Sequence, residues 1–289
     1  MNESMAAGRP GGLAKTQPEG LPKRLSEGLP EGLPAVLSEV LPEVLPILYR
    51  DEQLIAIHKP AGLLVHRTVL DRHETRFAVQ LLRDQIGQYV HPVHRLDRGT
   101  SGVLLFALER DIGRQLSAQF EAQTVDKTYL AVVRGHPPES GRIDHPLSRQ
   151  YDDYEFRSAS AVSAAQPAVT AYRRLATTEL PYANDRYPTS RYALLELKPE
   201  SGRRHQIRRH LKHLAHPVIG DATYGKGPHN RLFQTLFGCH RLLLACLEMR
   251  LTHPCSGQRL TLRAPLAEDF QTLLKQLGWA SAMAPQGQY

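Results

Sequence analysis

The stretch with the clearest chemical potential is HPVHRLDRGTSG, residues 91–102, in which one carboxylate lies among cations. Asp97 stands between Arg95 and Arg98, and an apolar run, Val103 to Leu108, follows directly. Neighbouring arginines favour the charged form of a carboxylate, which would keep Asp97 ready to act as a nucleophile or base. A surface loop with a salt bridge has the same pattern, so the motif alone leaves both interpretations open.

A second dense stretch is ESGRRHQIRRHLKHLAHPVIGDATYG, residues 200–225. Its first half contains five cations with no acid among them: Arg203, Arg204, Arg208, Arg209 and Lys212. If the segment is helical, Ile207, Leu211 and Leu214 form a buried stripe and three of the cations line a neighbouring face. Such a face suits phosphate groups, although a solvated basic surface is the competing interpretation.

The histidines of the same stretch do not have the spacing of a metal site. His205, His210, His213 and His216 are five, three and three residues apart. Zinc sites on a helix favour two histidines four residues apart, with an acidic residue available. The next acid along the chain is Asp221. We therefore predict no metal and favour contact with nucleic acid, or ordinary packing, for these side chains.

The charge of the chain is unevenly distributed and indicates a polyanionic partner. The net charge is +7 with an isoelectric point near 9.4. Residues 1–44 hold four Lys or Arg and six Glu, a net of −2, which leaves 32 basic and 23 acidic residues, a net of +9, for the remainder. A basic body favours nucleic acid as the partner, although many basic proteins bind none.

Other compositional features exclude several classes of protein. No apolar run approaches the ~18 to 20 residues of a membrane helix, and the first residues lack the pattern of a signal peptide. Three cysteines, Cys239, Cys246 and Cys255, are too few and too irregularly spaced for a disulfide framework or a zinc knuckle. We expect a cytoplasmic protein that binds no membrane.

The N-terminal region differs in kind from the rest of the chain. From Leu21 to Leu45 every fourth residue is leucine, but a helix is excluded by Pro22, Pro30, Pro34, Pro42 and Pro46. The spacing is typical of a short tandem repeat. We predict that residues 1–44 are a disordered extension of low complexity and that residues 45–280 form the folded, catalytic domain.

Hydrophobic periodicity in the folded part predicts more strands than helices. Strands are expected at 47–50, 52–58, 103–108, 126–134, 168–175, 192–198, 242–251 and 259–262, and helices at 77–86, 111–123 and 267–277. The strands do not alternate regularly with helices, and short turns join several of them. This order favours an α+β fold with a mixed, largely antiparallel sheet flanked by helices and loops.

Several motifs together resemble a known family. HRLDRGTSG is similar to the first catalytic motif of the RluA family of pseudouridine synthases. Four more landmarks follow in the family's order: HKPAG at 58–62, KTYLAVVRG at 127–135, SGRRHQIRRH at 201–210 and HPVIGDATYG at 216–225. The resemblance extends over roughly residues 46–265. It implies the pseudouridine synthase fold and an isomerase without a cofactor, which detaches uracil from ribose C1′ and rejoins it through C5.

The resemblance also implies roles for individual residues. Asp97 corresponds to the essential aspartate, Tyr129 to the active-site tyrosine and Arg208 to the arginine that pairs with the aspartate. Arg95 corresponds to the arginine that fills the space left by the flipped base, and flipping costs a few kcal/mol. The other expected substrate contacts are cations: Lys59, Arg203, Arg204 and Arg209.

Segments outside these motifs bear on the substrate. LLVHRTVLDRHE at 63–74 and RYPTSRYALLELKP at 186–199 resemble tRNA-modifying members of the family. They imply tRNA as the partner and its uridine 65 as the target, with rRNA, or RNA binding without catalysis, as alternatives. Two departures are Gly99, where a proline is usual, and Ala245-Cys246, where the family commonly has His-Ala. The sequence does not determine the oligomeric state, and a monomer is the expected form.

Overall fold

The computed structural model describes residues 44–67, 74–149, 164–184 and 187–283, which all belong to one compact unit, Glu39–Tyr289. The disorder predicted for residues 1–44 therefore concerns residues outside the described ranges, with Val44 as the one exception. The division into an extension and a catalytic domain stays a prediction. Within the described ranges, no helix has the length and apolar character needed to span a bilayer.

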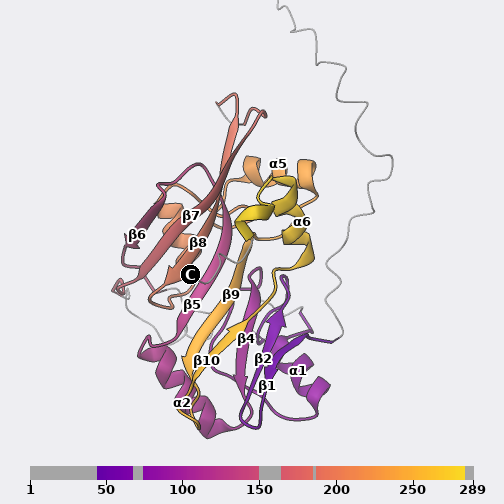
Figure 1. Cartoon of the computed structure of the whole chain (residues 1–289), viewed down its shortest axis with the longest axis vertical. Helices are drawn as coiled ribbons and strands as arrows, with labels where there is room; N and C mark the ends of the chain where they lie inside the picture. The colour runs from indigo at the N-terminus through magenta and orange to yellow at the C-terminus, as the bar shows by residue number, and fades with distance from the viewer. Residues whose placement is uncertain (1–43, 68–73, 150–163, 185–186, 284–289) are drawn as a thin grey trace, which may run out of the picture. The chain divides into compact units, whose positions relative to one another are not determined.

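Strands of the described ranges form one mixed sheet of ten (Figure 1). They are β1 Ile47–Arg50, β2 Leu54–Lys59, β3 His91–Pro92, β4 Ser101–Ala107, β5 Asp126–Arg134, β6 Ser140–Asp144, β7 Val169–Leu180, β8 Ser190–Pro199, β9 Leu244–Thr252 and β10 Arg259–Arg263. The order is β1-β2-β4-β9-β5-β8-β7-β6, with β3 paired to β4 and β10 paired to β9. Only the pairing of β4 with β9 is parallel, which confirms the predicted mixed, largely antiparallel sheet.

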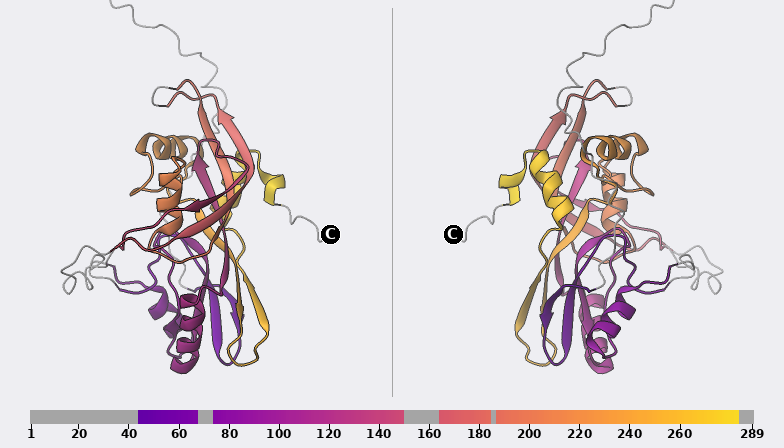
Figure 2. Two further views of the ribbon diagram at one scale, coloured as in Figure 1. Left: turned by 90° about the vertical axis from the view of Figure 1, so that its left-hand side faces the viewer. Right: turned by 90° about the vertical axis from the view of Figure 1, so that its right-hand side faces the viewer.

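Helices pack on both faces of this sheet. They are α1 Ala78–Ile86, α2 Arg110–Glu121, α4 Gln206–His213, α5 Gly227–Phe237 and α6 Glu268–Gln276, followed by a short 3-10 turn, Ala280–Met283. Figure 2 shows α2 and α4 on one face and α6 on the other. The alternation of side chains along β5 explains this arrangement. Ala131 and Val133 pack with Ile207 of α4, whereas Leu130 and Val132 belong to the cluster around Phe270 of α6.

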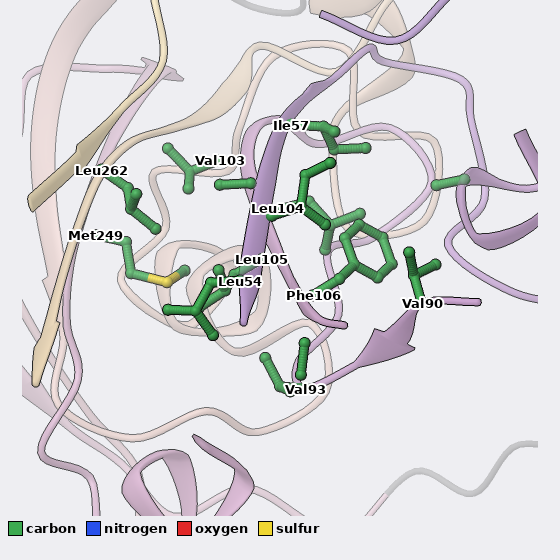
Figure 3. Packing of buried hydrophobic residues seen from close by; sticks show 14 of the residues in the cluster. Leu54, Ile57, Val90, Val93, Val103, Leu104, Leu105, Phe106, Met249 and Leu262 are labelled. Atoms are coloured by element: carbon green, nitrogen blue, oxygen red, sulfur yellow. The ribbon is translucent and has the colours of Figure 1, made fainter. Parts of the chain in front are cut away.

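The strand that follows the Asp97 motif lies in the centre of the larger core. Every residue of β4 is buried, because β2 and β9 pair with its two edges and hydrophobic side chains cover its faces. Figure 3 shows this packing for Leu54, Ile57, Val90, Val93, Val103, Leu104, Leu105, Phe106, Met249 and Leu262. Asp97 is therefore attached to one of the best-packed elements of the molecule.

Gly102 at the start of β4 is required by the close approach of β9. Its φ is +114°, and a Cβ placed there would lie 2.0 Å from the carbonyl oxygen of Cys246. Any other residue at this position would push β4 and β9 apart at their only parallel contact. The last glycine of the motif thus fixes the distance between the strand after Asp97 and the strand beside Tyr129.

The expected elements agree with the structure except in a few places. The second strand begins at Leu54 rather than 52, because the carboxylate of Asp51 accepts the N–H groups of Gln53 and Leu54 and forms a turn. The strand expected to end at 175 continues to Leu180 along β8. Within the described ranges, the elements that were not predicted are β3, β6, α5 and the 3-10 turn, and α4 confirms the helix considered for the basic stretch.

Candidate active site

Main-chain hydrogen bonds hold Asp97 in a turn immediately before β4. The N–H of Thr100 donates to the carbonyl of Asp97 at 3.0 Å, and the N–H of Gly62 donates to the carbonyl of Arg98 at 2.9 Å. The second bond joins the HKPAG segment to the Asp97 motif, so two motifs far apart in the sequence form one rigid loop pair. The Asp97 side chain is 20% exposed, which leaves it accessible to a substrate.

Arg208 binds the carboxylate of Asp97 and a second carboxylate at the same time. Its Nη1 donates to Asp97 Oδ2 at 2.9 Å. Its Nε and Nη2 donate to Oδ2 and Oδ1 of Asp221 at 2.7 and 2.9 Å, a two-pronged pairing that fixes the plane of the guanidinium. Burial by itself lowers the pKa of Arg208. The hydrogen bonds and charges of Asp221 and Asp97 have the larger combined effect and raise the pKa above its usual value. The arginine is therefore a permanent cation held in one orientation.

Asp221 is the residue of this site that sequence reasoning missed. In the sequence it is only the first acid after a run of histidines and cations, yet its side chain is completely buried and pairs with Arg208. Burial tends to raise the pKa of Asp221, but Arg208 and the N–H groups of Thr223 and Tyr224 lower it overall. Asp221 could have been found as the lone acid that follows a run of cations. The turn residues Thr223 and Tyr224 after it donate their backbone N–H groups to its carboxylate.

His205 and Tyr224 approach Asp97 from the other side. His205 Nε2 lies 3.7 Å from Asp97 Oδ1, and its Nδ1 lies 3.0 Å from the Tyr224 hydroxyl. Burial lowers the pKa of His205, although the charge of Asp97 opposes the shift. His205 also has a left-handed backbone, with φ +54°, at the N-terminus of α4. Strain of this kind is often concentrated at functional sites, where the surroundings impose the conformation.

A cavity of about 490 Å³ opens beside Asp97 and includes Tyr129 in its wall. Its volume lies within the ~300–1,000 Å³ range of ligand pockets. Burial raises the pKa of Tyr129 well above its usual value, and the neighbouring Cys246 adds to the shift. The phenol is therefore protonated at neutral pH, and the ring provides an aromatic surface in the cavity.

The predicted substrate contacts divide into two groups. Arg95, Arg203 and Arg204 line the cavity together with Asp97. Arg209 lies outside its lining, because its guanidinium donates to the carbonyl and hydroxyl oxygens of Ser148 at 2.9 and 3.0 Å. Arg209 therefore anchors α4 to the loop after β6 instead of facing the cavity.

The prediction that Lys59 contacts the substrate is wrong. The side chain is fully buried, and its ammonium donates to the carbonyls of Pro60, Leu63 and Arg98 at 2.8, 2.6 and 3.1 Å. These bonds occupy the donors of a lysine, so the charge is used inside the protein. Lys59 joins the HKPAG loop to the Asp97 loop and acts on the site only by positioning that loop.

Cys246, at the departure from the family pattern, touches the tyrosine of the site. It lies in β9, is fully buried and hydrogen-bonds with the Tyr129 hydroxyl. Burial raises the pKa of the Cys246 thiol to about 12, so it is uncharged. Ala245, the other member of the pair, is 2% exposed and packs in the core with Leu130.

Within the described ranges, no group of three or more potential ligands is arranged to hold a metal ion.

Comparison with known proteins identifies the class of enzyme that this geometry belongs to. Residues 53–213, more than half of the chain, match the family described as RNA pseudouridylate synthase. The chain belongs to this family.

Several relatives match nearly their whole length. The proteins named tRNA pseudouridine synthase C from Vibrio cholerae serotype O1 and Yersinia pestis are 50% and 51% identical over 237 and 239 residues, 82% and 83% of this chain and 97% and 93% of theirs. Its counterpart in Haemophilus ducreyi is 52% identical, covering 81% of this chain and 96% of that protein. Among solved structures, human RNA pseudouridylate synthase domain containing 4 has a TM-score of 0.61 at 26% identity, covering 81% of this chain and 93% of that one.

His94, in the wall of the cavity, should make the stability of the protein depend on pH. His94 Nε2 accepts the N–H of Leu105 at 2.9 Å, and its ring stacks on Phe120. Burial lowers the pKa of His94 to about 3. The unfolded chain takes up this proton near pH 6.5 and the folded chain does not, so stability is complete above about pH 6.5 and declines toward pH 3.

We therefore expect the melting temperature to fall between pH 7.5 and pH 5. The variant His94→Gln, which keeps a hydrogen-bond acceptor, should show a smaller fall. Exposed His240 provides the control, since His240→Gln should behave as the wild type does. A pH profile that His94→Gln leaves unchanged would show that protonation of His94 does not contribute.

Proposed function

We propose that this chain converts a uridine of tRNA to pseudouridine, and that uridine 65 is the target. The observation that carries the proposal is a partly exposed Asp97, which Arg208 holds in the wall of a cavity that Tyr129 and three further arginines also line. Relatives about half identical to this chain, all named tRNA pseudouridine synthase C, support tRNA as the substrate.

The chemistry requires one bond to break and one to form at the same carbon. Asp97 either attacks ribose C1′ as the N1–C1′ bond breaks, and is displaced from C1′ when C5 bonds there, or it removes the C2′ proton to form a glycal and returns that proton when C5 bonds to C1′. The detached uracil turns against the ring of Tyr129 and rejoins through C5, losing the C5 proton and gaining one at N1. Arg208 holds the carboxylate of Asp97 in one orientation in both routes, through the hydrogen bond to its Oδ2. No electron is transferred, and the product is an isomer of the substrate.

Access to the target requires the base to leave a helix. A-form RNA hides its major-groove edges, so the enzyme must recognise shape and phosphates before it extrudes the uridine. Arg203 and Arg204 lie on the cavity wall at the start of α4, where they can bind the backbone on either side of the flipped nucleotide. Arg95 is the exposed arginine of the same wall and occupies the vacated space in the helix. Since the substrate is tRNA, the proposed location is the cytoplasm.

Mapping the modified position tests this proposal. Purified enzyme is incubated separately with unmodified tRNA and unmodified 23S rRNA, and pseudouridine is mapped by carbodiimide treatment and primer extension. We expect a single new stop of primer extension at position 65 of tRNA. A tRNA in which the base pair that contains uridine 65 is replaced by C·G should give no such stop. Modification of rRNA alone would overturn the tRNA assignment, and absence of product in both RNAs would overturn the enzymatic one.

A further inference from the structure

A second cavity of about 420 Å³ adjoins the catalytic one and has no part in the chemistry described above. The two cavities share three lining residues, Gln123, Lys127 and Pro199, so they lie next to each other on the protein. The residues that line only the second cavity come from β5, β8, β9 and the segments next to them. A chain that enters the catalytic cavity can therefore continue into the second one past Lys127.

The acidic side chains of the second cavity are already paired with arginines. The pairs are Asp126 with Arg259, Glu200 with Arg142, and Glu248 with Arg250 and Arg263. Their negative charges are thus offset within the protein, so these acids repel an anionic ligand less than bare carboxylates would. Of the two lysines that also line this cavity, Lys198 pairs with Glu196, which leaves Lys127 as the lysine to consider for an anionic ligand.

Lys127 is the cation at the junction of the two cavities. Its side chain lies on the wall shared by both, two residues before Tyr129 on β5, so it faces the same side of the strand. It makes no ion pair with any residue in the ranges that the structure describes. Burial lowers the pKa of Lys127, although the charge of the neighbouring Asp126 opposes the shift.

We propose that Lys127 binds the phosphate between the target uridine and its neighbour, and that this neighbouring nucleotide occupies the second cavity. The inference rests on the proposed function, because it takes the ligand of the first cavity to be a flipped uridine. When that base enters beside Asp97, its own phosphates lie at the rim, and a compact ammonium is a suitable partner for one of them. The enzyme would then draw two adjacent nucleotides, and not one, out of the helix.

Measurements of tRNA binding by a catalytically inactive variant test this site. In an Asp97→Asn background, Lys127→Met replaces the ammonium by an apolar side chain of similar length. We expect the dissociation constant for tRNA to rise roughly tenfold at low salt, and the slope of log Kd against log salt to fall by about 0.7–0.9, the value of one phosphate contact. Lys275→Met, at an exposed lysine of α6, is the matched control and should change neither quantity.

A neutral linkage in the RNA distinguishes a phosphate contact from a general loss of charge. A methylphosphonate is placed either 5′ or 3′ of uridine 65 in a ligated synthetic tRNA. One of the two positions should weaken binding to the protein with Lys127 but should not weaken binding to Lys127→Met any further. If neither position does so, or if Lys127→Met binds and responds to salt as Lys275→Met does, the phosphate site is overturned.

Two further measurements separate the possible failures. The melting temperature of Lys127→Met shows whether the variant is folded, and the methylphosphonate result on the unsubstituted Lys127 protein holds regardless of that outcome. Turnover of wild-type enzyme on tRNA tests the proposed function independently. A wild type that produces pseudouridine, combined with unchanged binding by Lys127→Met, refutes this inference alone.

Discussion

The variant Asp97→Asn should release no measurable tritium from tRNA containing 5-tritiated uridine while binding that RNA nearly as the wild type does. An amide nitrogen cannot attack C1′ or accept a proton at neutral pH, so we expect turnover to fall at least about a thousandfold. Folding should persist, because the amide oxygen can still accept the hydrogen bond from Arg208 that now ends on Asp97 Oδ2. The substitution should therefore abolish the chemical step while folding and RNA binding are retained.

The matched control for Asp97→Asn is the same substitution at Asp111. That acid lies in the first turn of α2, is exposed and pairs only with Arg114 among the contacts of its side chain that the structure describes. Asp111→Asn should keep full turnover. Substantial tritium release by purified Asp97→Asn, under conditions in which the control is active, would remove Asp97 from the mechanism.

Substitution of Arg208 by methionine should lower both activity and stability. It leaves Asp221 as a fully buried carboxylate without its cation, and loss of one partner from a buried pair costs about 3–5 kcal/mol. It also leaves Asp97 without its hydrogen-bond donor. Arg208→Lys should rescue both properties only in part, because a single ammonium cannot bind two carboxylates in the fixed geometry of a guanidinium. Urea denaturation and tritium release measure the two effects.

A second substitution separates the stability effect from the catalytic one. In Arg208→Met, the further change Asp221→Asn removes the unpaired charge and should restore part of the lost free energy of unfolding without restoring turnover. Asp221→Asn alone should destabilise the protein, since Arg208 then loses the carboxylate that fixes its plane. Full activity in Arg208→Met would show that another group orients Asp97.

The sequence was sufficient to predict the fold class and several of the residues that line the cavity. Alternation and turn patterns predicted most strands, and motif resemblance predicted that Asp97, Tyr129 and Arg208 belong to one site. β6 was missed because its residues, SGRID, hardly alternate between apolar and polar. α5 was missed because Pro228 and a Gly at its start resemble a loop, although proline is well tolerated in the first turn of a helix.

Apart from the pairing of Arg208 with Asp97, which the resemblance implied, the partners of individual cations could not be predicted in the same way. Arg208 and Arg209 are adjacent and chemically identical, but a helix turns about 100° between them. One consequently faces Asp97 and the other faces Ser148. For Lys59, the acceptors are the carbonyls of Pro60 and Leu63 and that of Arg98, which lies 39 residues away in the sequence and is brought close only in the folded chain. Sequence identifies a charge, whereas its counterpart depends on contacts between distant segments.

The position of β9 determines when during synthesis the enzyme becomes competent. β9 lies between β4 and β5 in the sheet, although it is made long after both of them. The strand that follows Asp97 and the strand that carries Tyr129 are therefore joined only once residues 244–252 have left the ribosome. A nascent chain that stops earlier has Asp97 and Tyr129 but lacks the strand that joins their two strands. A chain interrupted before β9 would therefore hold these two residues next to strands that are not yet joined in the sheet.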